Sequence, residues 1–178
     1  MKHFDPFADR LCRDIRNDLS EALMNSLRRL DLAPAQKIAE RYLATDLEPI
    51  HRQYIDDHMQ RYSRALERIR LQYIHDDFRR ALVLWDEELF FEVHEILEHT
   101  WMNAAGKRKL ILQAMIRAAG MYIHLEHGNT KGATSMAAKA VAAFEVNRSE
   151  VPDFLDLDLL LSKLRRVDPV PPKLTTGA

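Results

Sequence analysis

The sequence has 178 residues, of which 47% are hydrophobic and 30% charged, with only five glycines. This composition excludes an intrinsically disordered chain, and the length suits one well-buried core. The net charge of −1 provides no broad field for binding nucleic acid or an anionic membrane. Cys12 is the single cysteine, which excludes an internal disulfide framework. With no apolar leader at its start and no membrane-spanning run, we expect a cytoplasmic protein.

The first 80 residues predict an N-terminal helical extension. We expect Asp5 and Pro6 to cap a first helix that continues to about Asp31, because apolar residues recur in it at three- and four-residue steps. A shorter helix follows, and then a long one over about 46–74. The first helix carries an apolar seam through which a homodimer could form, made of Leu19, Leu23, Leu27 and Leu30.

Few residues of this extension have side chains that could carry chemistry. Cys12 lies in the middle of a helix with no histidine near it in sequence, so we interpret it as a small core residue. The histidines of the long helix are unevenly spaced, and we expect surface or boundary positions for His51, His58 and His75. These interpretations leave the extension without a predicted site.

The sequence of the second part of the chain predicts a set of closely packed helices. We expect Asp86 to cap a helix from Glu88 to about Asn103. The next helix, over 109–127, is apolar around nearly its whole circumference, which is typical of a buried central helix.

An alanine-rich helix to about residue 146 and a short helix around 157–166 complete the pattern. Strand signals are absent, so we predict an all-α fold, a compact bundle of about six to eight helices. We expect one domain over 1–178, with its core at 81–146 and a flexible, proline-rich tail at 168–178.

Ionisable side chains concentrate on the helix 88–103. His94 and Glu98 are four residues apart and therefore stack along one edge of its apolar face, with Glu95 beside them. On the central helix, Gln113, Arg117 and His124 fall in one narrow polar stripe. Because buried polar groups need partners, we expect this stripe to face the cluster on the preceding helix.

Several ordered motifs over residues 81–144 resemble the family catalogued as domain of unknown function 309 (DUF309). The similar segments are Ala81-Leu82…Leu84-Trp85-Asp86, Phe90-Phe91-Glu92-Val93-His94-Glu95-Ile96-Leu97-Glu98…Trp101, Gln113-Ala114-Met115-Ile116 and His124…Gly128-Asn129…Gly132-Ala133. The resemblance implies a compact helical domain, and some members carry the label metal-dependent hydrolase.

The sequence departs from the family pattern at three positions. Glu88 stands in place of a turn glycine, so the entry into the helix should be more regular here. Val93 replaces a small alanine, and Arg117 replaces the second glutamine of the family motif.

A metal site is one interpretation of the cluster. In the pattern His-Glu-x-x-His two histidines bind zinc, and here Glu98 stands at the second ligand position after His94. His124 is a candidate third ligand, and zinc, manganese or iron would suit such donors. The positive charge of Arg117 on the facing helix argues against this interpretation, and no cofactor is favoured.

A metal-free binding pocket is a second interpretation. Glu95 or Glu98 could act as a base and His94 or His124 as an acid, while Arg117 could bind a small anionic ligand. The other candidate ligand-binding residues are Gln113, His124, Trp101 and Asn129.

The third interpretation, which we favour at this stage, is structural. A buried network of His, Glu, Arg and Gln side chains can fix the register of two helices without any ligand. The sequence does not decide whether the protein is an enzyme.

Overall fold

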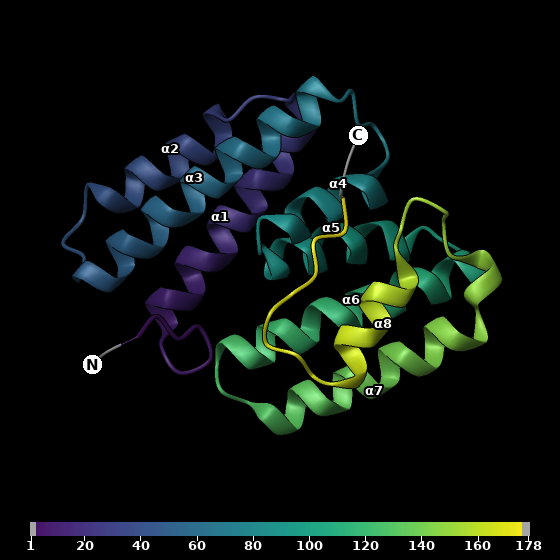
Figure 1. The fold of residues 1–178 in the computed structure, drawn as a ribbon. Helices are drawn as coiled ribbons and strands as arrows, with labels where there is room; N and C mark the ends of the chain where they lie inside the picture. Colours follow the sequence, from purple (N-terminus) through teal and green to yellow (C-terminus); the bar gives the residue numbers. More distant parts are fainter. Residues whose placement is uncertain (1–2, 176–178) are drawn as a thin grey trace. The chain divides into compact units, whose positions relative to one another are not determined.

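The computed structural model describes residues 3–175, and helices are the only regular elements in that range (Figure 1). Eight α-helices and one short 3₁₀-helix are present among these residues, which confirms the predicted all-α fold. The chain separates into two compact units, Met1–Ile74 and His75–Ala178. The boundary between the two units, after Ile74, falls close to residue 80, where the N-terminal extension was expected to end.

The first unit is a three-helix arrangement made of α1 (Arg10–Arg29), α2 (Ala33–Leu43) and α3 (Pro49–Leu71). Asp9, and not Asp5, caps α1: its Oδ1 accepts a hydrogen bond from the Cys12 backbone N–H at 3.0 Å. Asp5 instead closes the preceding turn by accepting from the backbone N–H groups of Phe7 and Ala8. The expected cap was therefore one turn too early.

Burial within this unit corrects two expectations from the sequence. Leu19, Leu23 and Leu27 are at most 2% exposed in the single chain, so the expected dimer seam is already covered. His51 is only 4% exposed, although its uneven spacing suggested a surface or boundary position. Cys12 is a core residue as expected, at 1% exposure.

The second unit is built around α6. Its elements are α4 (Asp77–Asp86), α5 (Phe90–Met102), α6 (Gly106–Glu126), α7 (Thr130–Val146), η1 (Arg148–Glu150) and α8 (Leu157–Arg165). The most extensive packing in this unit joins α6 to α7 and to α5, and this confirms α6 as the central helix. An aromatic cluster of Trp85, Phe90 and Tyr122 ties α4, α5 and α6 together, with ring centroids 4.7–5.2 Å apart.

The turn between α4 and α5 differs from the sequence-based expectation. Asp86 is the last residue of α4 and does not cap α5, which begins after Leu89 without any side-chain cap. Glu88 has a φ of 58°, the left-handed conformation that a glycine adopts readily. The turn thus keeps a glycine-type geometry despite the glutamate, and the entry into α5 is not more regular.

The C-terminal segment returns from α8 to α4 (Figure 1). Trp85 Nε1 donates to the Pro172 carbonyl oxygen at 2.9 Å. The buried Asp86 carboxylate accepts from the backbone N–H groups of Leu174 at 2.6 Å and Thr175 at 3.0 Å. The described part of the expected flexible tail is therefore hydrogen-bonded to α4, while residues 176–178 lie outside the described residues.

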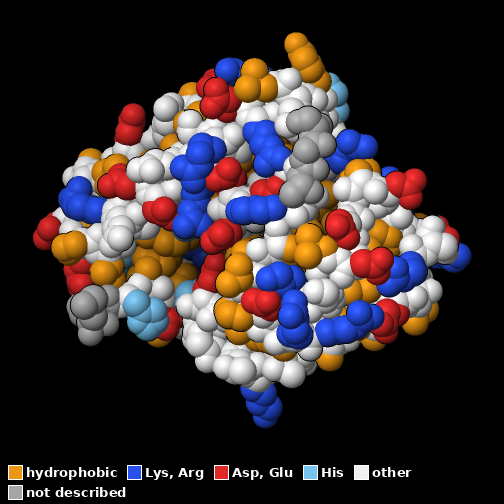
Figure 2. Space-filling model, viewed as in Figure 1, with side chains coloured by type: hydrophobic (Ala, Val, Ile, Leu, Met, Phe, Trp, Pro, Cys, Tyr) orange, Lys and Arg blue, Asp and Glu red, His pale blue; other side chains and the backbone are white. Residues whose placement is uncertain are grey.

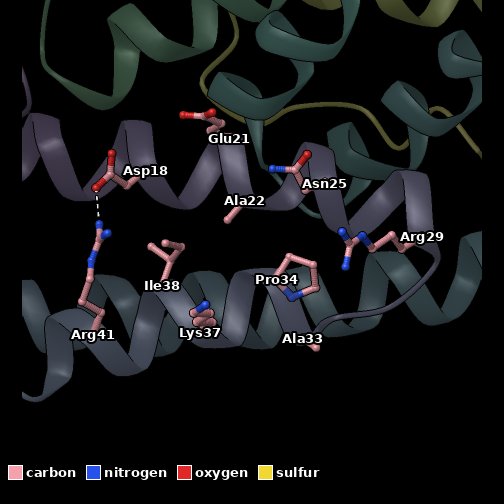
Figure 3. Close-up of a pocket in the computed structure, with 10 residues that line it drawn as sticks. All are labelled: Asp18, Glu21, Ala22, Asn25, Arg29, Ala33, Pro34, Lys37, Ile38 and Arg41. Carbon is pink, nitrogen blue, oxygen red and sulfur yellow. Dashed lines mark hydrogen bonds and ion pairs between the residues drawn. The ribbon is translucent and has the colours of Figure 1, made fainter.

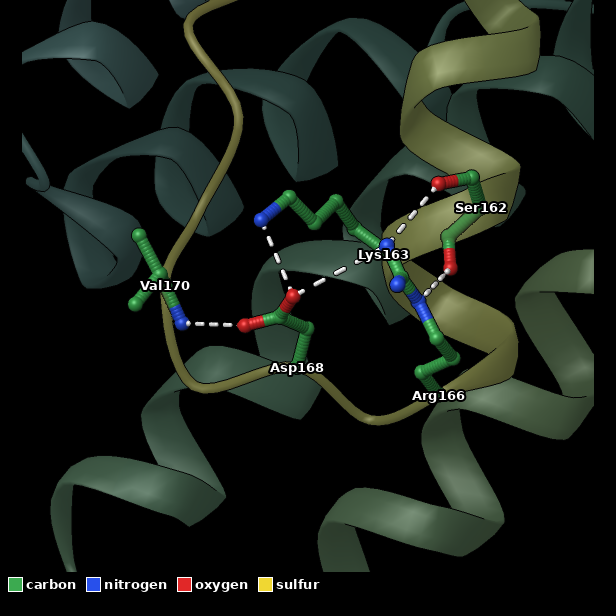
Figure 4. A network of polar contacts seen from close by, with 5 residues as sticks. All are labelled: Ser162, Lys163, Arg166, Asp168 and Val170. Atoms are coloured by element: carbon green, nitrogen blue, oxygen red, sulfur yellow. Dashed lines mark hydrogen bonds and ion pairs between the residues drawn. The ribbon is translucent and has the colours of Figure 1, made fainter.

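The start of this segment is fixed by a second set of polar contacts (Figure 4). Asp168 Oδ2 lies 2.9 Å from the Lys163 ammonium, and Asp168 Oδ1 accepts from the Val170 backbone N–H at 2.9 Å. The hydrogen bond from Lys163 lowers the pKa of Asp168 below its ordinary value. The carboxylate is thus ionised at neutral pH and holds the chain as it leaves α8.

Lys and Arg side chains intermingle with Asp and Glu over the face shown in Figure 2, as a net charge of −1 suggests. Within residues 3–175, no helix combines the length and apolarity needed to cross a membrane.

We expect Asp86→Ala to lower the free energy of unfolding by about 2–3 kcal/mol, because it leaves buried N–H groups of the C-terminal segment without their acceptor. Chemical denaturation measures this, with Asp153→Ala as the control. Asp153 is an exposed carboxylate of the same unit, and its loss should change stability by less than about 0.5 kcal/mol. Equal effects of the two substitutions would show that Asp86 does not anchor the segment.

Candidate functional site

The rotation of α5 is set by its apolar residues. Phe90, Val93 and Leu97 are at most 4% exposed, and this apolar face is packed within the protein. At about 100° per residue, the same rotation brings His94 and Glu98 to the partly exposed edge of the helix. The sequence therefore places this pair correctly at the border of the apolar face.

Three donor groups converge at this edge. His94 Nδ1 lies 3.4 Å from Glu95 Oε1 and 3.7 Å from Glu98 Oε2. One ligand atom from each of the three residues lies within 4.8 Å of the other two. The side chains are 32%, 40% and 51% exposed, respectively, so solvent reaches the group. The arrangement can bind a cation and remains open on its outer side.

Glu92 departs from the pattern expected for α5. Helical spacing puts it with Glu95 and His99 on the more polar side of the helix, yet it is 1% exposed. Helical spacing alone did not predict this burial, because the buried face of α5 extends beyond its apolar residues.

The polar stripe of α6 does not bond to this cluster. Among the described residues, no hydrogen bond or ion pair links Gln113 or Arg117 to the carboxylates of α5. Both side chains are only half-buried. Trp101 has a different partner, since the Lys109 ammonium lies 4.2 Å from the centre of its ring. The expected buried network across the two helices is therefore not formed by these residues.

His124, in the last turn of α6, and Asn129, which precedes α7, meet where these two helices join. Asn129 Oδ1 accepts from the Gly132 backbone N–H at 2.9 Å and so caps α7, while Asn129 Nδ2 lies 3.1 Å from His124 Nδ1. Gly128 takes a φ of 68°, which favours glycine. His124 is not part of the group of donor atoms that contains His94. The residues of the pattern His-x-x-x-Gly-Asn-x-x-Gly thus form a turn whose conformation is held by the contacts of Asn129, and we call it the locked turn.

The structure brings together a second group that sequence reasoning missed. Donor atoms of Asp9, Cys12 and His51 lie within 4.8 Å of one another in the first unit. The hydrogen bond from the Cys12 backbone N–H lowers the pKa of Asp9, and burial raises the pKa of the Cys12 thiol. No sequence motif marks this group, because His51 comes from a different helix.

A groove of about 590 Å³ lies between α1 and α2, as Figure 3 shows. At one end Arg41 forms an ion pair with Asp18 at 2.6 Å, and the Tyr42 hydroxyl donates to the same carboxylate oxygen at 2.7 Å. Burial, and to a smaller extent this hydrogen bond, raises the pKa of Tyr42 to about 12. The phenol therefore stays protonated at neutral pH and acts as a donor that holds the two helices together.

Comparison with known proteins supports the resemblance. Residues 78–136 match the model of the family described as domain of unknown function (DUF309). The matched segment contains α4, α5, α6 and the beginning of α7, and therefore the whole His94 cluster and the locked turn. No curated protein and no solved structure gives a significant match to the chain.

We expect Gly132→Ala to destabilise the protein by about 1–3 kcal/mol, since a Cβ there would lie 2.7 Å from His124 Nδ1. Gly120→Ala is the matched control, because its Cβ would meet only the Met136 side chain at 3.7 Å. Adding a methyl group inside α6 should stabilise it by up to about 1 kcal/mol. If denaturation curves of the two variants coincide, the turn is not locked in this way.

Proposed function

We propose that the DUF309 region binds a divalent metal ion through His94, Glu95 and Glu98. The observation that carries this proposal is the convergence of their three donor atoms within 4.8 Å on a partly exposed helix edge. Zinc, manganese and iron accept imidazole nitrogen together with carboxylate oxygen. The two carboxylates would balance the charge of such an ion.

The absence of cross-helix bonds favours a ligand site over the structural network. A network that fixes helix register needs its members paired across the interface, and within residues 3–175 His94, Glu95 and Glu98 pair only with one another. Side chains that converge without such partners and remain accessible suit an external cation better. The site would keep coordination positions open for water or substrate, as catalytic metal sites do.

Arg117 supports a second role for the same region. Its half-buried guanidinium has no ion pair among the described residues, so a small anion can still take its hydrogen bonds. Because Arg117 is not paired with the α5 carboxylates, its charge is a weaker argument against a metal than the sequence suggested. We propose it as the binding group for an anionic ligand of this region.

Hydrolysis is the reaction class that such a site would serve. A bound divalent ion supplies an acidified water molecule. His94, Glu95 and Glu98 would hold the ion, and a carboxylate oxygen of either glutamate that does not coordinate it could accept a proton. The family label metal-dependent hydrolase agrees with this chemistry, which we place second to metal binding itself.

The experiment is a calorimetric titration of the purified, metal-free protein with Mn²⁺. Mn²⁺ prefers oxygen and nitrogen donors over thiolate, so it selects this group over one that contains cysteine. We expect one ion per chain, and a loss of affinity of at least about tenfold in both His94→Ala and Glu98→Gln, because each removes one of three ligands.

His99→Ala is the matched control, since His99 lies on the same helix, is exposed and is not in the group of donor atoms. It should bind Mn²⁺ like the wild type. Affinity that is unchanged in His94→Ala, or lowered equally in His99→Ala, would refute the proposed site.

A further inference from the structure

Two helices of the first unit begin close to each other and bring three metal-binding side chains together. Asp9 caps α1, Cys12 lies in its first turn, and His51 lies in the first turn of α3. One donor atom from each lies within 4.8 Å of the other two. Asp9 is exposed, whereas Cys12 and His51 are 1% and 4% exposed, so the group has one open side and a buried base.

His51 is the unusual member of this group. Neither ring nitrogen has a hydrogen-bond partner among residues 3–175, although both are buried. A buried polar group without a partner is costly, and most such groups in native proteins are satisfied by protein, water or an ion. An imidazole nitrogen close to a thiol and a carboxylate is a combination of donors that suits a metal ion.

An aromatic side chain lies against His51, and it begins a chain of ring contacts. The Phe4 ring meets the His51 ring edge-on, with the centroids 6.2 Å apart. Phe4 also stacks on Tyr54 at 3.6 Å, and Tyr54 stacks on His58 at 3.8 Å. The segment that precedes α1 is thereby held against α3. Such an apolar surround limits solvent access to a metal centre and strengthens its electrostatic interactions.

We propose that Asp9, Cys12 and His51 form a zinc site in the first unit, independent of the metal site proposed for the DUF309 region. Sulfur, imidazole nitrogen and carboxylate oxygen are the three ligand types that zinc accepts, and three protein ligands leave a fourth position for water. A thiolate and a carboxylate balance the two positive charges of the ion. Binding forms a bond between sulfur and zinc, and the thiol proton passes to solvent.

The role of this site is structural. The bound ion would connect Asp9, which precedes α1, to the first turn of α3, at the place where both helices begin. Asp9 can take part without giving up its cap, because Oδ1 accepts from Cys12 N–H and Oδ2 remains for the metal. The site would stabilise the folded state by binding it in preference to the unfolded chain.

The test is a titration of the full-length, metal-free protein with Co²⁺, which replaces zinc and absorbs in the near ultraviolet when bound by a thiolate. We expect a thiolate-to-cobalt band that saturates at one ion per chain and is displaced by Zn²⁺. Cys12→Ser should abolish the band, and His51→Gln should weaken Co²⁺ binding at least about tenfold. His58→Gln, on the same helix but outside the group, is the matched control and should retain it.

Variants of the other site keep the two proposals distinguishable. His94→Ala and Glu98→Gln should leave the thiolate band unchanged, whether or not they lose Mn²⁺. Thermal unfolding gives a second measurement, in which Zn²⁺ should raise the Tm of the wild type by roughly 5–10 °C at one hundred times Kd, and that of Cys12→Ser by much less. The proposal is overturned by a folded wild type without the band, or by Co²⁺ binding that His51→Gln leaves at wild-type affinity.

Discussion

The aromatic cluster of Trp85, Phe90 and Tyr122 is the interaction on which the geometry of the second unit depends. Trp85 is fully buried, meets the other two rings edge-on and donates its indole N–H to the C-terminal segment. Phe90 and Tyr122 stack on each other with their centroids 4.7 Å apart. Aromatic side chains of this size dominate the energetics of a core, so three of them in contact leave α5 little freedom to rotate. The direction of the His94 cluster follows from this constraint.

Tyr122 shows how strongly this cluster excludes water. Its hydroxyl oxygen is buried and has no hydrogen-bond partner among the described residues. Burial raises the pKa of Tyr122 far above its ordinary value, and the phenol remains neutral at physiological pH. The buried side of α5 is thus largely apolar, with Glu92 as a charged exception, while His94, Glu95 and Glu98 lie on the partly exposed edge.

The sequence predicted the features of this protein that depend on local patterns. Hydrophobic spacing identified the helices and the central position of α6. The pairing of His94 with Glu98 was also predictable, since side chains at i and i+4 of one helix lie on the same face. Local rules were sufficient for this pair, but they placed the cap of α1 one turn too early.

Expectations were wrong where the partner is distant in sequence. Asp86 precedes a helix and resembles a cap, yet its carboxylate binds backbone groups of residues 174 and 175. His124 was expected to face the carboxylates of α5, but a hydrogen bond with Asn129 satisfies it locally. His51 was expected at the surface because nothing in its own helix shows that Cys12 of another helix lies close to it. Burial and long-range pairing decide such positions, and neither can be read from spacing.

The two proposed sites differ in the rigidity of their surroundings. The α5 group lies on one helix, at an open edge, and its donors are free to adjust to a cation and to an additional ligand. The group at the start of α1 and α3 spans two helices and has a buried base, which suits a structural ion better than a catalytic one. Under the two proposals, the stabilising ion and the reactive ion would lie in different units of the chain.

The most direct measurement of the central claim is an anomalous-scattering map from crystals grown with Mn²⁺. The account predicts a peak at the edge of α5, about 2.0–2.3 Å from donor atoms of His94, Glu95 and Glu98. A map without a peak at that position would contradict the account, whether or not Mn²⁺ is bound elsewhere in the protein.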